Sequence, residues 1–136
     1  MYLTNKSYHA VTVMVDIMLH SQNQSVPVRV SEIVGRQPIS VSYIENLFIY
    51  LVKASLVKGI RGPNGGYVLK KMPDQITIAD IIRATSKPLK DGYCGKEDCN
   101  HSNCITAYLW EGLGQETDVY LSKLTLADLI PVGIDN

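Results

Sequence analysis

Residues 30–52 read VSEIVGRQPISVSYIENLFIYLV, and this stretch decides the fold. It predicts a helix of about two turns over Val30–Arg36, a turn at Gln37-Pro38-Ile39 and a second helix that begins near Ser40. The second helix carries a single apolar stripe, made of Ile44, Leu47, Phe48, Leu51 and Val52. Two helices joined by a tight turn, the second of them longer and amphipathic, are typical of a helix-turn-helix.

The residues that follow distinguish this motif from a plain helical hairpin. Leu56–Ile60 and Tyr67–Lys70 are short β-prone runs that bracket Arg61-Gly-Pro-Asn-Gly-Gly66. Three Gly, one Pro and one Asn in six residues are turn chemistry, so the two runs are expected to form a hairpin. A helix-turn-helix followed by a basic-tipped hairpin is a winged helix, whose second helix fits the DNA major groove and whose wing can enter the minor groove.

The remaining segments are mainly helical. Thr4 or Asn5 can cap a first helix that runs to about His20. The other expected elements are an extended connector at Val26–Val28, a helix from Ile76 to about Ala84 with Thr77 and Asp80 at capping-box spacing, a loop over Thr85–Asn103, a long helix from Cys104 and a short terminal helix at Leu124–Leu129. The predicted class is mainly α with a small β-hairpin wing. We expect residues 1–71 to be a winged helix-turn-helix domain, and residues 72–136 to hold a connecting helix, a cysteine loop (about 85–103) and a dimerisation helix.

Charge is unevenly distributed along the chain. The 136 residues contain 13 Lys and Arg and 13 Asp and Glu, and a net charge of zero argues at first against a polyanionic partner. Residues 1–71, however, hold eight basic and three acidic groups, a net charge of +5, and the rest holds the opposite −5. The basic half coincides with the expected winged helix, so the distribution favours double-stranded DNA as a partner.

The long helix has no evident partner within the chain. Its apolar positions are Ile105, Leu109, Leu113, Tyr120, Leu121 and Leu124, and Gly112 and Gly114 weaken it by up to about 1 kcal/mol each. An apolar stripe left in water would be an exposed patch, so we favour pairing with a second copy in a homodimer. The alternative is that this helix folds back on its own domain.

The three cysteines are clustered at Cys94, Cys99 and Cys104. An odd number within eleven residues does not suit a disulfide framework, and no leader peptide or membrane span is evident, so we expect a cytoplasmic protein that is not bound to a membrane. Thiolates clustered in this way indicate a metal or redox site.

Several motifs together resemble the IscR/NsrR/RirA family of bacterial regulators, which are winged-helix dimers, many with an iron–sulfur cluster. These motifs are Leu3-Thr4-Asn5-Lys6 with Ala10-Val11-Thr12, Ile39-Ser40-Val41-Ser42-Tyr43-Ile44-Glu45, Leu56-Val57 with Arg61-Gly-Pro-Asn-Gly-Gly-Tyr67, and Cys104-Ile-Thr-Ala-Tyr-Leu-Trp110. The resemblance extends from Met1 to Ile130 and implies a transcriptional regulator that is not an enzyme.

The resemblance also implies which residues contact DNA. Ser40, Ser42, Tyr43, Glu45 and Asn46 would occupy the recognition helix, and Arg61 would enter the minor groove from the wing. Hydroxyl groups suit phosphates, Asn46 can pair with an adenine edge, and Glu45 can accept from cytosine N4. Other roles stay open: Tyr43 as a core residue, Ser40 as a helix cap, and Ser42 with Glu45 as a capping box.

For the cysteines the resemblance implies a 2Fe–2S cluster, which needs four protein ligands. This chain departs from IscR in two respects: the intervals of four residues between cysteines are shorter by one, and Ala107 stands where IscR has a ligating histidine. The fourth ligand could be His101 in the loop or His9 from the partner subunit. Zinc held by the cysteines and His101 ranks lower, because the usual short Cys-x2-Cys pair is missing.

The function predicted from the sequence is that of a homodimeric regulator that binds a palindromic DNA site. Its binding would depend on the cluster and so respond to iron–sulfur supply, iron, redox state or nitric oxide. A cluster-free regulator of the same fold, or a small iron–sulfur redox protein that does not bind DNA, is the alternative.

Overall fold

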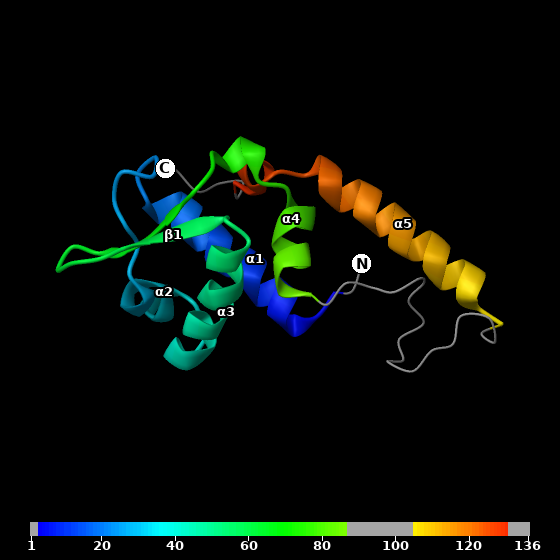
Figure 1. Ribbon diagram of the computed structural model, residues 1–136, viewed down its shortest axis with the longest axis horizontal. Coiled ribbons are helices and arrows are strands. Elements are labelled where there is room, and N and C mark those ends of the chain that lie inside the picture. Colours follow the sequence, from blue (N-terminus) through cyan, green and yellow to red (C-terminus); the bar gives the residue numbers. More distant parts are fainter. Residues whose placement is uncertain (1–2, 87–104, 131–136) are drawn as a thin grey trace.

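The computed structural model describes residues 3–86 and 105–130. In chain order the elements are α1 (Asn5–His20), α2 (Val30–Arg36), α3 (Val41–Lys53), β1 (Val57–Ile60), β2 (Gly66–Leu69), the 3₁₀ turn η1 (Pro73–Gln75), α4 (Ile78–Thr85), α5 (Ala107–Lys123) and the 3₁₀ turn η3 (Leu126–Leu129). Helix α1 runs through the middle of the body and contacts α3, α4 and strand β2, while α5 extends away (Figure 1). The predicted mainly α fold with a small hairpin is confirmed.

The helix starts are set by local caps. The Thr4 hydroxyl accepts a hydrogen bond from the Ser7 N–H at 3.1 Å at the start of α1. Helix α4 has the predicted capping box, since Thr77 and Asp80 each bond the other's backbone N–H at 3.1 Å. Ser40 is the N-cap of helix α3, and its hydroxyl accepts from the Tyr43 N–H at 3.3 Å. The capping box considered for Ser42 and Glu45 is therefore wrong, because the helix starts two residues earlier.

The hydrophobic core is built mainly from one face each of α1, α3 and α4. Fully buried side chains include Met14, Ile17, Ile33, Ile44, Leu47, Phe48, Leu51, Ile76, Ile81 and Leu126. The apolar stripe of α3 is buried as predicted except for Val52, which is 44% exposed. Helix α4 lies against both α1 and α3. Burial of these stripes supplies most of the free energy that holds the short helices in place.

The hairpin is a two-stranded antiparallel sheet in which Val57 faces Leu69 and Ile60 faces Gly66. Val28 was expected only as a connector, but its N–H and C=O bond to the backbone of Tyr67 at 2.9 and 2.8 Å. The Tyr67 ring stacks on Phe48 with centroids 3.8 Å apart. The base of the wing is therefore anchored to the chain before α2 and to the recognition helix α3.

The chain returns to the core after α5. Leu124 C=O accepts from the Ile78 N–H at 2.9 Å, and the Leu126 N–H donates to Ile76 C=O at 2.8 Å. The Thr125 N–H donates to the Asp128 carboxylate, so the predicted capping signature starts a turn of 3₁₀ helix. This return anchors the carboxyl end of α5 beside α4.

A buried carboxylate joins α1 to the helix-turn-helix. The Asp16 side chain is 0% exposed and accepts from Arg36 at 3.0 and 2.8 Å and from Gln37 at 3.1 Å. The hydrogen bond to Asp16 raises the pKa of Arg36 above its usual value. Arg36 is the last residue of α2 and Gln37 lies in the turn, so this cluster holds the turn against α1.

Helix α5 has no buried residue among the seventeen that it contains. Its exposed apolar side chains include Tyr108, Leu109, Leu113, Val119 and Tyr120. At its carboxyl end it contacts the body, where Leu121 packs on the core and Asp118 pairs with Arg83 of α4. None of the described helices is long and apolar enough to cross a membrane.

Replacing Asp16 with Ala should lower the free energy of unfolding by about 3 kcal/mol, because it leaves the Arg36 guanidinium and the Gln37 amide without their buried acceptor. Asp118→Ala is the matched control. It breaks an ion pair whose side chains are 43% and 53% exposed, so it should cost no more than about 1 kcal/mol. Urea unfolding of both variants checks this, and equal losses would contradict it.

Replacing Gly65 with Ala should destabilise the protein by about 1–3 kcal/mol, since an added Cβ would lie 2.1 Å from the Ile60 carbonyl oxygen. At Gly35 in α2 an added Cβ meets nothing within 4 Å. Gly35→Ala should therefore stabilise, by up to about 1 kcal/mol, through helix propensity. Thermal unfolding compares the two, and a stable Gly65→Ala variant would show that the wing turn can relax.

Candidate nucleic-acid interface

The exposed face of α3 carries polar side chains at helical spacing. Ser42, Glu45 and Asn46 are all exposed, and the 65% exposed side chain of Ile49 follows at the next turn. Positions i, i+3, i+4 and i+7 lie along one face of a helix. The structure thus brings three of the predicted recognition residues together on the solvent side, opposite the stripe that anchors α3 in the core.

Tyr43 and Ser40 serve structural roles at the start of the same helix. The Tyr43 side chain is half-buried against the core, with its hydroxyl 3.4 Å from His9 Nδ1 and its ring edge-on to the imidazole at 5.3 Å. Ser40 is exposed and caps α3. Ser40 therefore forms the helix cap that the sequence allowed for it, and Tyr43 packs against the edge of the core.

A second contact between α1 and α3 was not predicted. The Lys6 ammonium lies 3.4 Å above the centroid of the Tyr50 ring. A hydrogen bond from Lys6 lowers the pKa of the Tyr50 phenol below its usual value. Lys6 and His9 are three residues apart on α1, so one face of that helix supports both ends of the recognition helix.

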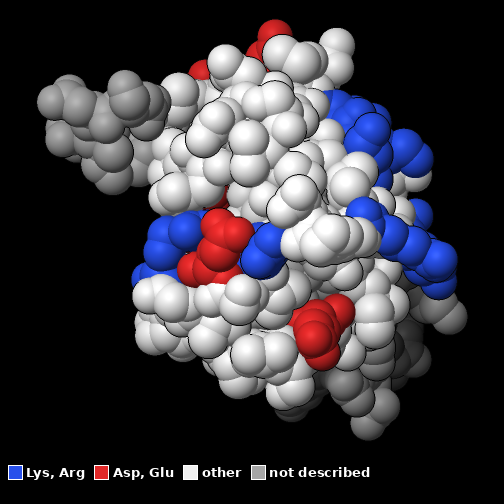
Figure 2. Space-filling model, turned by 90° about the vertical axis from the view of Figure 1, so that its left-hand side faces the viewer, with Lys and Arg blue, Asp and Glu red and all other residues white. Residues whose placement is uncertain are grey.

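The wing presents Arg61 to solvent directly after β1. On the side of the molecule that faces the viewer in Figure 2, Lys and Arg side chains gather along one edge, and a smaller group of basic and acidic side chains lies at the opposite edge. Six further basic residues of residues 1–71 are also exposed: Arg29, Arg36, Lys53, Lys58, Lys70 and Lys71. The charge asymmetry of the sequence is thus present on the surface of the winged helix.

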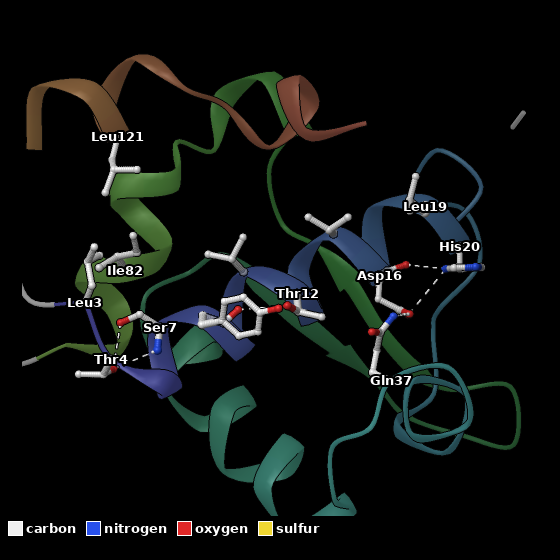
Figure 3. Close-up of a pocket in the computed structure, with 13 residues that line it drawn as sticks. Leu3, Thr4, Ser7, Thr12, Asp16, Leu19, His20, Gln37, Ile82 and Leu121 are labelled. Carbon is white, nitrogen blue, oxygen red and sulfur yellow. Dashed lines mark hydrogen bonds and ion pairs between the residues drawn. The ribbon is translucent and has the colours of Figure 1, made fainter. Parts of the chain in front are cut away.

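An apolar groove of about 620 Å³ follows the outer side of α1. We call it the α1 groove. Its apolar lining includes Val11, Val15 and Leu19 from α1, Leu3 from the chain just before that helix, Ile82 from α4 and Leu121 from α5. Figure 3 shows Leu3, Ile82 and Leu121 at one end, and Asp16, His20 and Gln37 at the other.

Of the predicted metal ligands, only His9 lies within the described residues. Cys94, Cys99, Cys104 and His101 lie outside the described residues. Within residues 3–86 and 105–130, no three His, Cys, Asp or Glu side chains are grouped as a metal site would require. Ala107 is the first residue of α5, and His9 is half-buried on α1.

The helix-turn-helix, the exposed face of α3 and the basic hairpin define a winged-helix DNA-binding protein. A family model described as Rrf2, iron-dependent transcriptional regulator, matches residues 3–131. The chain belongs to this Rrf2 family of transcriptional regulators.

Individual relatives agree with that assignment. The HTH-type transcriptional regulator IscR of Yersinia pseudotuberculosis serotype O:1b (strain IP 31758) is 42% identical over 132 residues, which are 96% of this chain and 79% of the relative. The IscR of Serratia proteamaculans (strain 568) matches with the same identity and coverage. These relatives are named as regulators and not as enzymes, which confirms the prediction that the chain is not an enzyme.

Solved structures give the same result. The structure of T. potens IscR has a TM-score of 0.75 at 32% identity and covers 96% of this chain and 86% of that one. The structure of CymR (YrzC), the global cysteine regulator of B. subtilis, has a TM-score of 0.75 at 31% identity and covers 95% of each chain. The predicted winged helix is thereby confirmed.

Proposed function

We propose that this protein is a cytoplasmic, homodimeric regulator that binds a palindromic DNA site, and that an iron–sulfur cluster modulates its binding. The observation that carries the proposal is the exposed polar face of α3 beside a basic wing. Residues 1–71 are the proposed DNA-binding domain. Residues 72–136 are the proposed half for cofactor binding and dimerisation.

On DNA, α3 would lie in the major groove. Glu45 would accept from cytosine N4 and repel phosphate, Asn46 would pair with an adenine edge, and Ser42 would bond a phosphate or a base. Ser40 and the first backbone N–H groups of α3 would face phosphate. Tyr43 would contribute chiefly by holding α3 against α1, since its hydroxyl lies near His9.

The proposed homodimer rests on α5. Tyr108 is 91% exposed and Leu113 54%, and a helix with this much apolar surface is stabilised when a second copy covers it. The α1 groove adjoins α5, because Leu121 of this helix lines it. A twofold axis through such an interface would present two recognition helices to major grooves roughly 34 Å apart.

For the cluster, the donor set of Cys94, Cys99 and Cys104 has the right chemistry, because thiolates are the usual ligands of iron–sulfur groups. His9 of the partner subunit or His101 would complete it. When bound, the cluster would supply a centre sensitive to iron–sulfur supply, iron, redox state or nitric oxide. A ligating histidine needs a partner for its second ring nitrogen, and His9 has the Tyr43 hydroxyl near Nδ1.

The chain itself suggests how ligation would affect DNA binding. The cysteine segment joins the carboxyl end of α4 to the amino end of α5. The α4 end is tied to α1, because the buried Thr85 hydroxyl lies 3.5 Å from the Ser7 hydroxyl. Ligation would restrain this segment and so change the positions of α5 and α1. Through these two helices it would change the distance between the two α3 helices of the dimer.

A cluster-free regulator is the second candidate. Ala107 cannot ligate a metal, and the cysteine intervals are shorter than those of IscR. In that case the DNA-binding residues keep their roles and only the modulation is lost. Metal analysis would distinguish an iron–sulfur cluster from zinc at the same cysteines and from a protein without metal. DNA titration would distinguish a regulator from a redox protein that does not bind DNA.

Replacing Arg61 with Ala should weaken binding to a palindromic duplex by about tenfold, because the variant has no guanidinium to enter the narrow minor groove. The slope of log affinity against log salt should fall by about 0.9 for each phosphate that the variant no longer neutralises. Lys123→Ala removes the same charge from α5, outside the proposed DNA-binding domain, and should leave the affinity for DNA unchanged. Fluorescence anisotropy measures both. If the Arg61→Ala variant binds DNA like the wild type, the wing is not part of the DNA interface. If the wild-type protein binds a single half-site as tightly as the palindromic duplex, the proposed dimer is contradicted.

Anaerobically purified protein should be coloured and should contain iron and sulfide in equal amounts. Of the variants His9→Ala and His101→Ala, the one that loses the cluster identifies the fourth ligand. The control is His20→Ala, which should keep the cluster, because the His20 imidazole bonds the Asp16 backbone carbonyl at 2.8 Å and is not a proposed ligand. Absorbance with iron and sulfide assays reads out the result. Colourless protein after anaerobic reconstitution would exclude the cluster and leave DNA binding to be tested separately.

A further inference from the structure

The guanidinium of Arg29 reaches from the residue before α2 to the turn of the wing. Its Nη2 donates to the carbonyl oxygen of Pro63 at 2.5 Å, across 34 residues of sequence. Arg29 is the N-cap position of α2 but makes no side-chain cap there. Its side chain is therefore engaged by the wing and not by its own helix.

The wing turn has few other restraints. Residues 61–64 are all exposed, and within the turn the Gly65 N–H donates to Gly62 C=O at 2.9 Å. Below it, the backbone of Val28 holds Tyr67 of β2, and Gly66 passes so close that an added Cβ would lie 2.6 Å from the Val28 oxygen. Residues 28 and 29 thus hold the wing at two levels: Val28 at its base and Arg29 at its tip.

We infer that Arg29 is a positioning residue that braces the wing turn and thereby orients Arg61, two residues before Pro63, toward DNA. This inference rests on the proposed function for its consequence, while the brace itself is a property of the free protein. A charged donor on a backbone carbonyl is well suited to this role, because such bonds are stronger than neutral ones. The competing possibility is that Arg29 leaves Pro63 and contacts phosphate itself.

The first experiment tests the brace without DNA. Limited trypsin digestion of the full chain, followed by mass spectrometry, gives the rate of cleavage at the Arg61–Gly62 bond. Arg29→Ala should raise this rate by about fivefold, the equivalent of one net hydrogen bond of roughly 1 kcal/mol. Arg29→Lys should be intermediate, and Lys58→Ala, which removes the same charge from β1, should cleave like the wild type. An unchanged rate in Arg29→Ala would overturn the inference.

The second experiment is a double-mutant cycle on the DNA affinity. If Arg29 acts through Arg61, Arg29→Ala should weaken binding about fivefold in the wild-type background. It should change neither affinity nor salt slope once Arg61 is already Ala. Additive losses, with a further fall of about 0.9 in the slope, would identify Arg29 as a phosphate contact and overturn the positioning role. If the wild-type protein shows no salt-dependent affinity for DNA, the proposed function is wrong. The trypsin cleavage rates would still test whether Arg29 holds the wing turn.

Discussion

The buried carboxylate of Asp16 is the interaction on which the arrangement of the helices depends. A charge removed from water must be fully satisfied, and here its bidentate charged donor is the last residue of α2, with a further donor in the turn that follows. Since both donors precede the start of α3 by only a few residues, the position of the recognition helix relative to α1 is tied to this cluster. Burial of the apolar core brings these elements together, and the cluster then fixes the end of α2 and the turn against α1.

Helix α1 connects the parts of the molecule that regulation would have to link. It meets α3 through Lys6 and His9, the helix-turn-helix turn through Asp16, and the end of α4 through Ser7. Its outer side lines the α1 groove next to the exposed helix α5. Contacts of α1 therefore link the end of α4 to the recognition helix.

Much of the fold was predictable because its signals are local. Caps at Thr4 and Thr77, the Gly-rich turn of the wing and the stripe of α3 depend on residues within one or two turns of one another. The candidate site was predictable in part. Ser42, Glu45, Asn46 and Arg61 are exposed as expected, whereas half-burial of Tyr43 and the cap at Ser40 depend on how α3 meets α1.

The sequence by itself determined the class of fold, the family and the separation of a basic half from an acidic half. Only the tertiary structure decided that Arg36 and Gln37 meet Asp16, that Arg29 meets Pro63, and that Val28 pairs with Tyr67. The physical reason is range. Periodicity and capping act over three or four residues, but these contacts join side chains and strands 20 to 39 positions apart, and such pairs come together only when the core has set the relative placement of the elements.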